Sequence, residues 1–584
     1  MKKSRFPVMA AAAVLALGAC QLLPPSMPDY PPAQNTVWLN QGWDQKIRDT
    51  YHAADQGTLT FGMPLEWFMA LEQPSLSPFQ MPPLAAKAYL DTFGFIPGDG
   101  DLPVGFAKGQ VYREPRYGAV PLNAVTQQPW HGVGFTCAAC HTGRLTYQGT
   151  EFLIDGGSAL IDLGSFRTAL GQSLLFTKIN PLRWARFETK VLGPNASNEA
   201  KQTLRAQFED VWNEGKHEHD LETKTAAGTV TEGFSRLDAL NRIGNQVFAI
   251  DLKEDRNFAP LTAPVHFPHI WTAPWFTWVQ YNGSIMQPMV RNAGEALGVK
   301  ASVNLMDKQH PLFESTVQVD TLHWMEQRLA GEKPNETRGF TGLKSPAWPP
   351  GLPPIDEKLA AKGMGLYNEM CAGCHRPAVN TPAFWSGDWW TTIQGNKYLE
   401  LKQIPIGVVG TDPEQARGMK ARTVVLPADF PTQKHGFGEA LGDVVELVAK
   451  AWYGTNHKTA AEQNEMNGGR PNRLQVLDSY KARPLNGIWA VPPYLHNGSV
   501  PSLHALLSPR VPGEKVSLGD REFDPVKVGY RQSFLKGGFV LDTGKPGNLN
   551  TGHEFRDGPH GNGTVGRALT EAERYALIEY LKTL

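Results

Sequence analysis

Four of the five cysteines of the chain form two pairs that share one pattern. Each pair has two residues between the thiols and a histidine directly after the second, in CAACH at 137–141 and CAGCH at 371–375. Two thiols about one helical turn apart can each add to a vinyl group of haem, and the adjoining histidine can then ligate the iron. The pattern therefore predicts two covalently bound haem c groups. The predicted residues are Cys137, Cys140 and His141 at the first site, and Cys371, Cys374 and His375 at the second.

Three other interpretations of this pattern remain open from the residues alone. A zinc site needs four N or S ligands, so it would require the two motifs to meet in space. A thioredoxin-like redox pair does not need a histidine after it, and here the histidine occurs twice. Coincidence is the third interpretation, and it would have to happen twice in a chain with five cysteines.

The start of the chain resembles an export signal. Lys2, Lys3 and Arg5 precede an apolar stretch of about a dozen residues, which is too short to span a membrane and typical of a secretory signal peptide. The ending Leu17-Gly18-Ala19-Cys20 resembles a bacterial lipoprotein cleavage site, so we expect an acylated Cys20, and Gln21 is typical of outer-membrane sorting. An Ala-rich signal with a chance cysteine is the alternative. We expect a periplasmic protein held by a lipid anchor, because we find no other apolar run near 20 residues.

The composition and the prolines divide the chain further. Hydrophobic residues make up 41%, which excludes intrinsic disorder, and 56 basic against 57 acidic residues exclude a basic nucleic-acid footprint over the whole chain. The prolines in KSPAWPPGLPPID (344–356) predict a linker. The predicted parts are a signal peptide (1–19), a Pro-rich tether (20–35), an N-terminal haem domain with insertions (36–345) and a C-terminal cytochrome c domain (346–584).

Helices are expected at three places. Residues 354–370 have helical apolar spacing and deliver Cys371, and residues from Leu569 to the end form a second helix with a Thr570/Glu573 capping box. Residues 197–225 predict an exposed helix and turn. A helix before CxxCH and an amphipathic closing helix resemble a cytochrome c domain. The fold class is therefore mainly α with long irregular loops, arranged as two cytochrome-c-like haem domains with large insertions.

The sixth ligand of each iron decides between electron transfer and catalysis. His496, His553, Met419 and Met466 are the notable candidates downstream of the second motif, and spacing alone does not select among them.

Several longer stretches carry a family resemblance. The chain resembles the bacterial dihaem cytochrome c peroxidase superfamily, and within it the rubber-oxygenase branch, which includes fatty-acid dioxygenases and diol synthases. The stretches that carry the resemblance are YHAADQGTLTFGMPLEWFMALEQ (51–73), FTCAACHTGRLTYQG (135–149), GFSRLDALNRIGN (233–245), YNGSIMQPMVRNAGEALGV (281–299), PPYLHNGSVPSLHALL (492–507) and NTGHEF (550–555).

The resemblance implies roles for particular residues. The haem on His141 would be the catalytic centre with a face open to O2, and the haem on His375 would be an electron reservoir with His553 as its second ligand. His496 becomes a structural or inter-haem residue. A calcium ion between the haems is seen in relatives of the superfamily, and backbone carbonyls could ligate it here. The 230–300 region should line the first haem. The candidate wall or relay residues there are Trp271, Trp275, Phe276, Trp278 and Tyr281, and Arg291 is a candidate to orient a carboxylate.

Three functions follow as hypotheses. The first is an exported dihaem oxygenase that uses O2 on an unsaturated apolar substrate, either a fatty acid such as oleate or polyisoprene. We favour the fatty acid because the chain is short for a rubber oxygenase and an outer-membrane location offers lipids. The second is a dihaem peroxidase that reduces H2O2 with electrons from a small periplasmic donor. The third is an electron-transfer cytochrome, which needs far fewer residues than this chain has. No nucleic-acid partner is expected.

Overall fold

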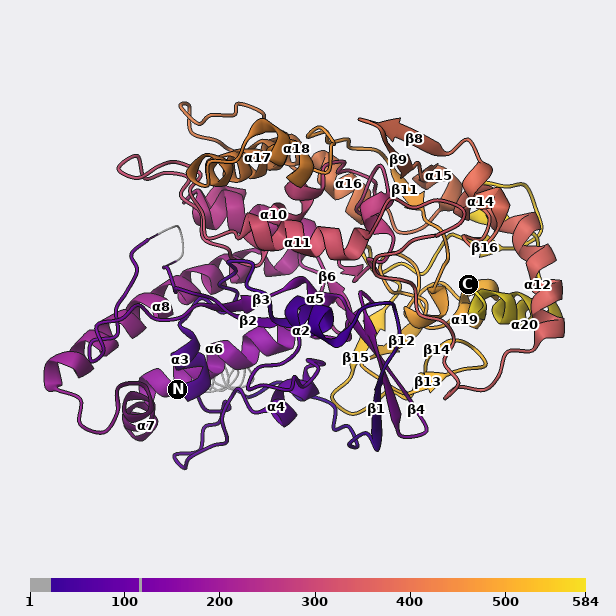
Figure 1. The fold of residues 1–584 in the computed structure, drawn as a ribbon. Helices are drawn as coiled ribbons and strands as arrows, with labels where there is room; N and C mark the ends of the chain where they lie inside the picture. The colour runs from indigo at the N-terminus through magenta and orange to yellow at the C-terminus, as the bar shows by residue number, and fades with distance from the viewer. Residues whose placement is uncertain (1–22, 115–117) are drawn as a thin grey trace, which may run out of the picture.

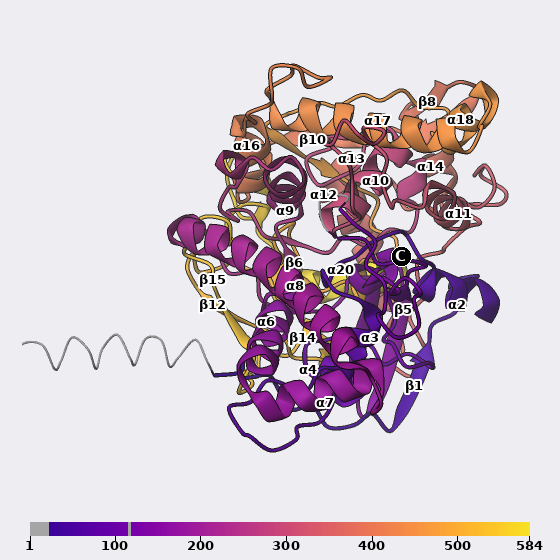
Figure 2. The same cartoon turned by 90° about the vertical axis from the view of Figure 1, so that its left-hand side faces the viewer.

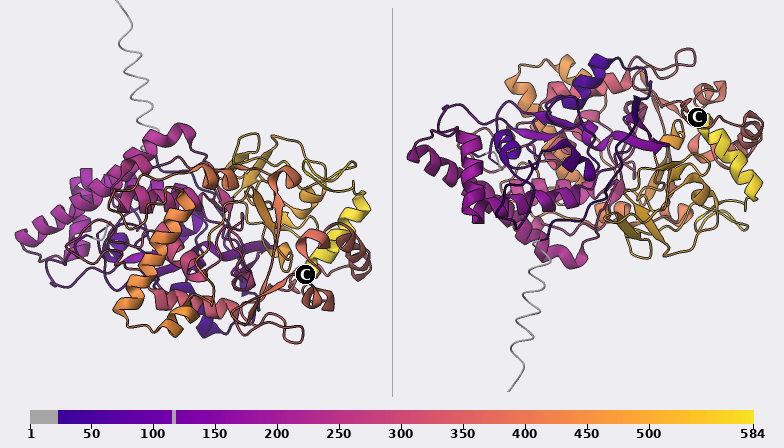
Figure 3. Two further views of the ribbon diagram at one scale, coloured as in Figure 1. Left: turned by 90° about the horizontal axis from the view of Figure 1, so that it is seen from above. Right: turned by 90° about the horizontal axis from the view of Figure 1, so that it is seen from below.

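The computed structural model describes residues 23–114 and 118–584. The predicted signal peptide, Cys20 and Gln21 lie outside these residues. Helices hold 37% of the chain and strands 14%, so the expectation of a mainly helical fold with irregular connections is confirmed. None of the described helices is long and apolar enough to cross a membrane. The molecule is elongated, with the long helix α8 at one end and the C-terminal helix α20 at the other (Figures 1 and 3).

The N-terminal third combines small sheets with helices. β1 pairs with β5 in parallel, β5 pairs with β4 antiparallel, and β2 pairs with β3 antiparallel. The elements of this part are β1 (Asn35–Trp38), α2 (Gln45–Ala53), α3 (Leu65–Ala70), α4 (Lys87–Thr92), β2 (Phe106–Lys108), β3 (Val133–Phe135), α5 (Cys137–Cys140), β4 (Thr142–Tyr147), β5 (Thr150–Asp155), α6 (Leu163–Ile179), α7 (Pro181–Leu192) and α8 (Asn198–Thr225).

A cluster of phenylalanines fixes the first cysteine motif in place. The ring of Phe135, the last residue of β3, contacts the rings of Phe61, Phe95 and Phe106 at centroid distances of 5.1 to 5.6 Å. Aromatic edge contacts of this kind add to the stability that burial provides. β3 therefore delivers Thr136 and the motif from a rigid core.

The segment 197–225 differs from its prediction. It forms one continuous helix, α8, whose first turn Ser197 caps by accepting from the backbone N–H of Ala200. Leu204, Phe208 and Val211 are buried at helical spacing. These residues give the helix a narrow apolar stripe, and α8 contacts α7. Figure 2 shows α8 running across the side of the molecule that faces the viewer.

The middle of the chain supplies the helices that cover the first motif. α9 runs directly into η3, a π-helical turn in which all seven residues are buried. Single π turns occur frequently near functional sites. The elements are β6 (Arg236–Leu237), α9 (Ala239–Gly244), η3 (Asn245–Asp251), β7 (Val265–His266), α10 (Pro288–Gly298) and α11 (Val319–Ala330), with short 3-10 turns at Ala226–Gly228, Asp255–Asn257 and Ala273–Trp275.

The C-terminal part contains the predicted helix pair. The helix expected over 354–370 is observed as α12, which begins at Glu357 after the N-cap Asp356, and the closing helix is observed as α20 with both hydrogen bonds of the Thr570/Glu573 capping box. The elements are α12 (Glu357–Met370), α13 (Ala372–His375), α14 (Pro382–Ser386), β8 (Trp390–Ile393), β9 (Asn396–Leu399), β10 (Lys402–Pro405), α15 (Ile406–Val409), α16 (Glu414–Ala421), α17 (Phe437–Thr455), α18 (Ala460–Met466), β11 (Ser479–Ala482), a 3-10 turn (Ile488–Ala490), α19 (Leu503–Leu507), β12 (Lys515–Leu518), β13 (Phe523–Asp524), β14 (Gly529–Tyr530), β15 (Phe539–Asp542), β16 (Glu554–Phe555), β17 (Thr564–Gly566) and α20 (Glu571–Lys582).

The α12–α20 contact depends on one glycine. A Cβ at Gly363 would lie 2.0 Å from the carbonyl oxygen of Ala576, so only glycine lets the two helices approach this closely. Tyr367 and Tyr580 pack across the same contact, with ring centroids 5.3 Å apart. This helix pair therefore holds the end of α12, and with it Cys371, against the C-terminus of the chain.

Candidate haem sites

The first motif is a single helical turn with its histidine just beyond the end. The side chain of Thr136 caps α5 by accepting from the N–H of Ala138, and the N–H of His141 donates to the carbonyl of Cys137 at 2.9 Å. A Cβ at Gly105 would lie 2.1 Å from the nitrogen of Ala139, so the turn rests directly on that glycine. The motif therefore has little freedom to move.

The imidazole of His141 is oriented by one hydrogen bond. Its Nδ1 lies 2.8 Å from the carbonyl oxygen of Pro268, and because a carbonyl can only accept, Nδ1 must carry the proton. Nε2 then has the free lone pair, which is the form that ligates a metal. Burial lowers the pKa of His141 to about 4, so the ring is neutral at physiological pH.

The second motif repeats this arrangement on a different support. α12 ends at Met370, and the N–H of His375 donates to the carbonyl of Cys371 at 2.8 Å. Nδ1 of His375 lies 2.8 Å from the carbonyl oxygen of Arg483 and must donate to it, which again leaves Nε2 free. Burial lowers the pKa of His375 as well. Both histidines thus have the tautomer and orientation that haem iron requires.

His553 faces His375 at a distance that fits an iron between them. An imidazole nitrogen bonds a transition metal at about 2 Å, which places the ring centroid about 3 Å from the metal. Two imidazoles on opposite sides of one iron therefore have centroids about 6 Å apart. The centroids of His375 and His553 are 6.1 Å apart. The pair fits a six-coordinate haem iron.

The backbone presents His553 in a constrained position. Its φ is +49°, in the left-handed region, and its N–H donates to the carbonyl of Val409 at 2.7 Å. Within the part of the chain that the structure describes, its buried Nδ1 has no hydrogen-bond partner. Burial, together with smaller electrostatic contributions from His375 and Arg510, lowers the pKa of His553 to about 3. The ring is therefore neutral and available as a ligand.

The ring contacts of the two motif histidines differ. Among the described residues, no aromatic ring or second histidine lies in ring contact with His141 in the way that His553 faces His375. His266 and His269 interact electrostatically with His141, and the buried Nε2 of each has no hydrogen-bond partner among the described residues.

Two partly buried cations at the end of β11 have no carboxylate partner among the described residues. Lys481 and Arg483 belong to β11 and the residue just after it, and neither forms an ion pair among the described residues. Lys481 donates to the carbonyl of Gln280, and Arg483 donates to the carbonyl of His269 at 2.6 Å while its Nε stays unpaired. Burial lowers the pKa of Lys481 well below its ordinary value and that of Arg483 to about 10.

Buried charges are costly unless a counter-charge accompanies them. Haem carries two propionates, so its carboxylates are the counter-charges that Lys481 and Arg483 lack. The donor set of this region thus fits haem in two respects, the histidine tautomers and the unmatched cations.

Arg483 also connects the two sites. Its carbonyl accepts from Nδ1 of His375, and its guanidinium donates to the carbonyl of His269, the residue after Pro268, whose own carbonyl accepts from His141. A second guanidinium nitrogen donates to the carbonyl of Trp271 at 3.2 Å. The two motif histidines are therefore joined through one short stretch of backbone and one side chain.

The other sequence candidates occupy varied positions. Trp271 is buried, with its ring 4.5 Å from that of His269, and its Nε1 donates to the carbonyl of Asn486. Trp275 donates to the carbonyl of Ala330, and Tyr281 donates to that of His266. Phe276 lies under the guanidinium of Arg483, at 5.3 Å, and Trp278 is half-buried.

Arg291 and the remaining ligand candidates have local partners. Arg291 pairs with Glu326, and its neighbour on the next turn of α10, Glu295, accepts from Gln280 at 3.1 Å. His496 stacks on Tyr480 at 4.1 Å. Met419 accepts from Asn282, and both Met419 and Met466 belong to the apolar core around α17. Among the described residues, His496, Met419 and Met466 therefore contact other partners and are not in ring contact with His141 or His375.

The placement of possible metal ligands limits the zinc interpretation. The described residues contain no group of three or more His, Cys, Asp or Glu side chains placed to hold one ion. The two motifs therefore do not meet as a four-ligand zinc site. A calcium site made of backbone carbonyls stays a prediction.

Sequence reasoning missed the residues that hold the motif histidines. Pro268, His269, Lys481 and Arg483 match no motif, and each acts through a backbone carbonyl or a tertiary contact. The one available signal was the pair of cations in SYKARPL, a strand that is otherwise largely apolar.

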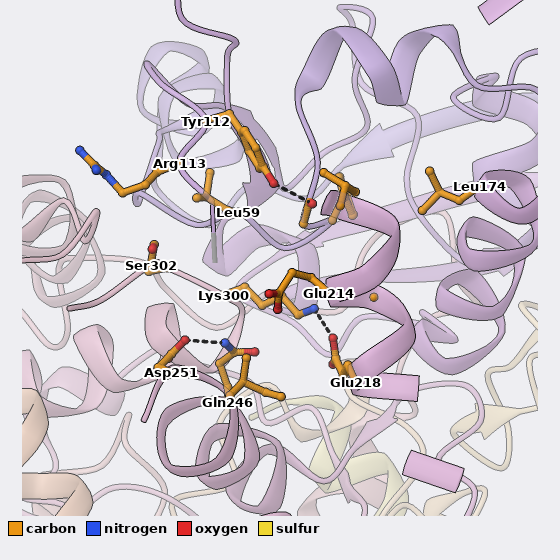
Figure 4. Close-up of a pocket in the computed structure, with 16 residues that line it drawn as sticks. Leu59, Tyr112, Arg113, Leu174, Glu214, Glu218, Gln246, Asp251, Lys300 and Ser302 are labelled. Atoms are coloured by element: carbon orange, nitrogen blue, oxygen red, sulfur yellow. Dashed lines mark hydrogen bonds and ion pairs between the residues drawn. The ribbon is translucent and has the colours of Figure 1, made fainter. Parts of the chain in front are cut away.

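A pocket of about 70 Å³ lies near the first motif, between α8, η3 and the segment 300–302 (Figure 4). Leu59, Ile250 and Ala301 form part of its apolar wall, and the ion pair Lys300–Glu218 crosses its polar side at 2.5 Å. No residue of either cysteine motif lines this pocket. We therefore do not place an apolar substrate there.

Comparison with known proteins defines the class. Residues 479–512, which contain Lys481, Arg483 and His496, match the family described as RoxA-like, cytochrome c-like. The chain thus contains a RoxA-like cytochrome c-like domain, and such a domain implies bound haem c. The chain is 50% identical over 597 aligned positions, covering all of both chains, to the uncharacterized protein y4iJ of Sinorhizobium fredii, and it belongs to the same family. A second protein of that organism, the uncharacterized y4iM, is 28% identical over 253 residues, which cover 40% of this chain and 51% of y4iM.

Proposed function

We propose that the chain is an exported dihaem c-type oxygenase that adds O2 to an unsaturated apolar substrate, with a fatty acid such as oleate favoured over polyisoprene. The difference between the two histidine sites carries this proposal. His375 faces His553 across a gap that fits a six-coordinate iron, whereas no second ring among the described residues is in ring contact with His141. A catalytic iron needs an open position, and an electron reservoir does not.

When bound, haem c supplies the iron that activates O2 and exchanges electrons. The chain supplies the rest. Pro268 and Arg483 fix the imidazoles of His141 and His375 by accepting from their Nδ1–H groups. Lys481 and Arg483 would hold propionates and so gain the counter-charge that they otherwise lack. The phenylalanine core behind β3 and the buried face of α10 exclude water from the region around Cys137.

Two acidic side chains near Cys137, Glu295 and Glu326, each have a hydrogen-bond or ion-pair partner. Burial raises the pKa of Glu295, and the neighbouring Arg291 opposes that rise. Gln280 donates to Oε1 of Glu295, and Arg291 is paired with Glu326. This arrangement places a carboxyl that can hold a proton in a dry region, where it can stabilise charge that develops on a substrate.

Incubation of the haem-loaded protein with oleate under isotope-labelled O2 tests the proposal. Insertion of one O2 into an allylic C–H bond breaks that bond, forms a C–O bond and leaves the hydrogen on the outer oxygen, so the hydroperoxide contains both oxygen atoms and needs no external reductant. We expect labelled hydroperoxide, hydroxy or diol products by mass spectrometry, together with O2 uptake. Recovery of oleate with no incorporated isotope and no O2 uptake would contradict the proposal for the fatty acid. The same assay with polyisoprene would test polyisoprene as the substrate.

A dihaem peroxidase is the second candidate, and the connection through Arg483 is the observation that favours it. Reduction of one H2O2 to two water molecules takes two electrons and two protons, so the second site would have to pass electrons to the first. A small periplasmic cytochrome or cupredoxin would supply them. Rapid H2O2 turnover that depends on such a donor, without O2 uptake on lipid, would identify this activity instead.

We further propose that the protein is periplasmic and anchored to the outer membrane by an acylated Cys20. This proposal is supported by the sequence alone, since residues 1–22 lie outside the described part of the chain. Mass spectrometry of the mature N-terminus tests it directly, and an unmodified N-terminus would contradict it.

A further inference from the structure

The most exposed large apolar side chains of the described residues gather at one corner of the molecule. Six such side chains are at least 59% exposed, and five of them belong to this corner. The sixth, Val511, lies in the C-terminal part. We call the five the apolar corner: Leu23 (61%), Leu76 (61%), Phe79 (78%), Ile179 (59%) and Leu182 (61%). Single exposed apolar residues are ordinary on a soluble protein, and a concentration of this kind marks an interaction surface.

Glu72 connects one part of the corner to the helices. Its carbonyl accepts from the hydroxyl of Ser173 on α6 at 2.7 Å, and its carboxylate pairs with Arg186 on α7 at 2.7 Å. The two ends of the loop 73–82 lie together next to Glu72, because the N–H of Gln73 donates to the carbonyl of Pro82 at 2.9 Å. Leu76 and Phe79 lie in this loop.

The turn between α6 and α7 provides the next two residues. Asn180 caps α7 by accepting from the N–H of Leu182 at 3.0 Å, so Ile179 and Leu182 flank a tight turn. Ile179 is six residues beyond Ser173 on α6, which is about 9 Å along the helix axis. Figure 2 shows α6 and α7 meeting at the lower edge of the molecule, with α3 beside α7.

Leu23 belongs to the same corner through α6. Its carbonyl accepts from Nε2 of Gln172, the neighbour of Ser173, at 2.9 Å. The loop, the turn and the first described residue are therefore all attached within about two turns of α6.

Three ion pairs border the corner. Lys178 pairs with Glu209, Arg186 with Glu72, and Lys201 with Glu188. The side chains of the corner itself are all apolar, so it suits an apolar partner better than a highly charged one.

The segment that follows Cys20 is held against the body. Met27 packs beside Gly537, whose added Cβ would lie 2.4 Å from the Met27 backbone. The hydroxyl of Tyr30 donates to the carbonyl of Gly519 at 2.6 Å, and the guanidinium of Arg521 lies 3.4 Å from its ring centroid. These contacts fix residues 27 and 30 against the body of the protein. Two residues separate Cys20 from Leu23, so the three steps between their Cα atoms reach at most about 11 Å when fully extended.

We propose that the apolar corner rests on a lipid bilayer and inserts its side chains at the membrane surface. This inference rests on the proposed acylation of Cys20, because that acyl group would lie within about 11 Å of Leu23. A short link and a fixed neighbouring segment leave the corner at the bilayer, where its exposed apolar side chains lose their contact with water. The membrane would then set the orientation of the whole molecule, with α6, α7 and the loop 73–82 facing lipid.

Vesicle flotation separates the contribution of the corner from that of the anchor. The haem-loaded chain is exported behind a cleavable signal peptide in place of residues 1–20, so that it carries no acyl group but keeps all described residues. Vesicles of phosphatidylethanolamine and phosphatidylglycerol serve as the probe. We expect this chain to float with the vesicles, with little change at high salt, and the double variant Phe79→Ser/Leu182→Ser to lose binding about tenfold.

A matched variant controls for general surface polarity. Val511→Ser/Phe534→Ser removes two exposed apolar side chains elsewhere, and it should float like the unaltered chain. Equal flotation of both double variants would overturn the proposal, as would the absence of flotation for the unaltered chain. Dimerisation through the corner, detected by light scattering without vesicles, would also overturn it. Haem absorbance confirms that each variant is folded, and the oleate assay is independent of all these outcomes.

Hydrogen–deuterium exchange on the acylated protein in the same vesicles provides a second measurement. The amides of residues 73–82 and 176–184 should exchange more slowly than in the unacylated chain without vesicles. Unchanged exchange in these two segments would contradict the proposal even if the protein is anchored.

Discussion

Arg483 shows how much can depend on a residue that no sequence motif marks. Its carbonyl orients His375, and its guanidinium donates to two carbonyls of the segment that orients His141. It is buried among groups that provide no carboxylate, and its pKa is lowered to about 10 by burial. Arg483 therefore helps to orient both motif histidines and also places a positive charge near them.

A charge change at this position should alter the reduction potential of the haem beside it. A nearby positive charge stabilises the reduced iron, so Arg483→Met should lower the potential by about 60 mV, equivalent to a tenfold change in the equilibrium constant. Arg483→Lys keeps the charge and should change the potential much less. Potentiometric titration of the haem absorbance measures both. Equal potentials in the two variants would show that Arg483 acts through packing alone.

The histidine in each motif was predictable because its position is fixed by covalent chemistry. The partners of those histidines were not, since Pro268 and Arg483 contribute backbone carbonyls, and every residue has one. His553 was selected by resemblance, and the facing ring of His375 at 6.1 Å supports that choice. His496, the other histidine that the sequence brought forward, stacks on Tyr480 instead.

Helices α12 and α20 were predictable from local signals, namely apolar spacing and a capping box, because those signals act within one element. Their close contact was not predictable, since it depends on Gly363 meeting the backbone of Ala576 from the other end of the domain. The π turn η3 and the packed segment 23–30 escaped prediction for the same reason, because tertiary contacts stabilise them.

Two glycines of α12 make this contact testable. Gly363→Ala should lower the free energy of unfolding by about 1–3 kcal/mol, because the new methyl group overlaps the Ala576 carbonyl. Gly365 has no atom within 4 Å of an added Cβ, so Gly365→Ala should raise it by about 0.5–1 kcal/mol through helix propensity. Denaturant unfolding of the haem-loaded protein measures both changes. A change of the same sign in the two variants would contradict this account of the helix pair.

At the level of the complete protein, one apolar core surrounds both motifs. Ala138 beside the first motif and Cys371 of the second belong to the same buried cluster. Trp348, in the Pro-rich segment expected to act as a linker, packs on Trp489 of that region. The two sites therefore share a rigid surrounding, which suits electron exchange between them. The predicted domain bounds and the N-terminal cytochrome-like domain stay predictions.

The central claim is that one site is open and the other is closed, and CO binding to the reduced protein tests it most directly. CO needs a free position on ferrous iron, so the difference spectrum, scaled to total haem, should show binding to about half of the haem. His553→Ala should raise this to nearly all of the haem, and His496→Ala should leave it unchanged. An unaltered protein that binds no CO would mean that both irons are closed, which would contradict the oxygenase and identify an electron-transfer cytochrome.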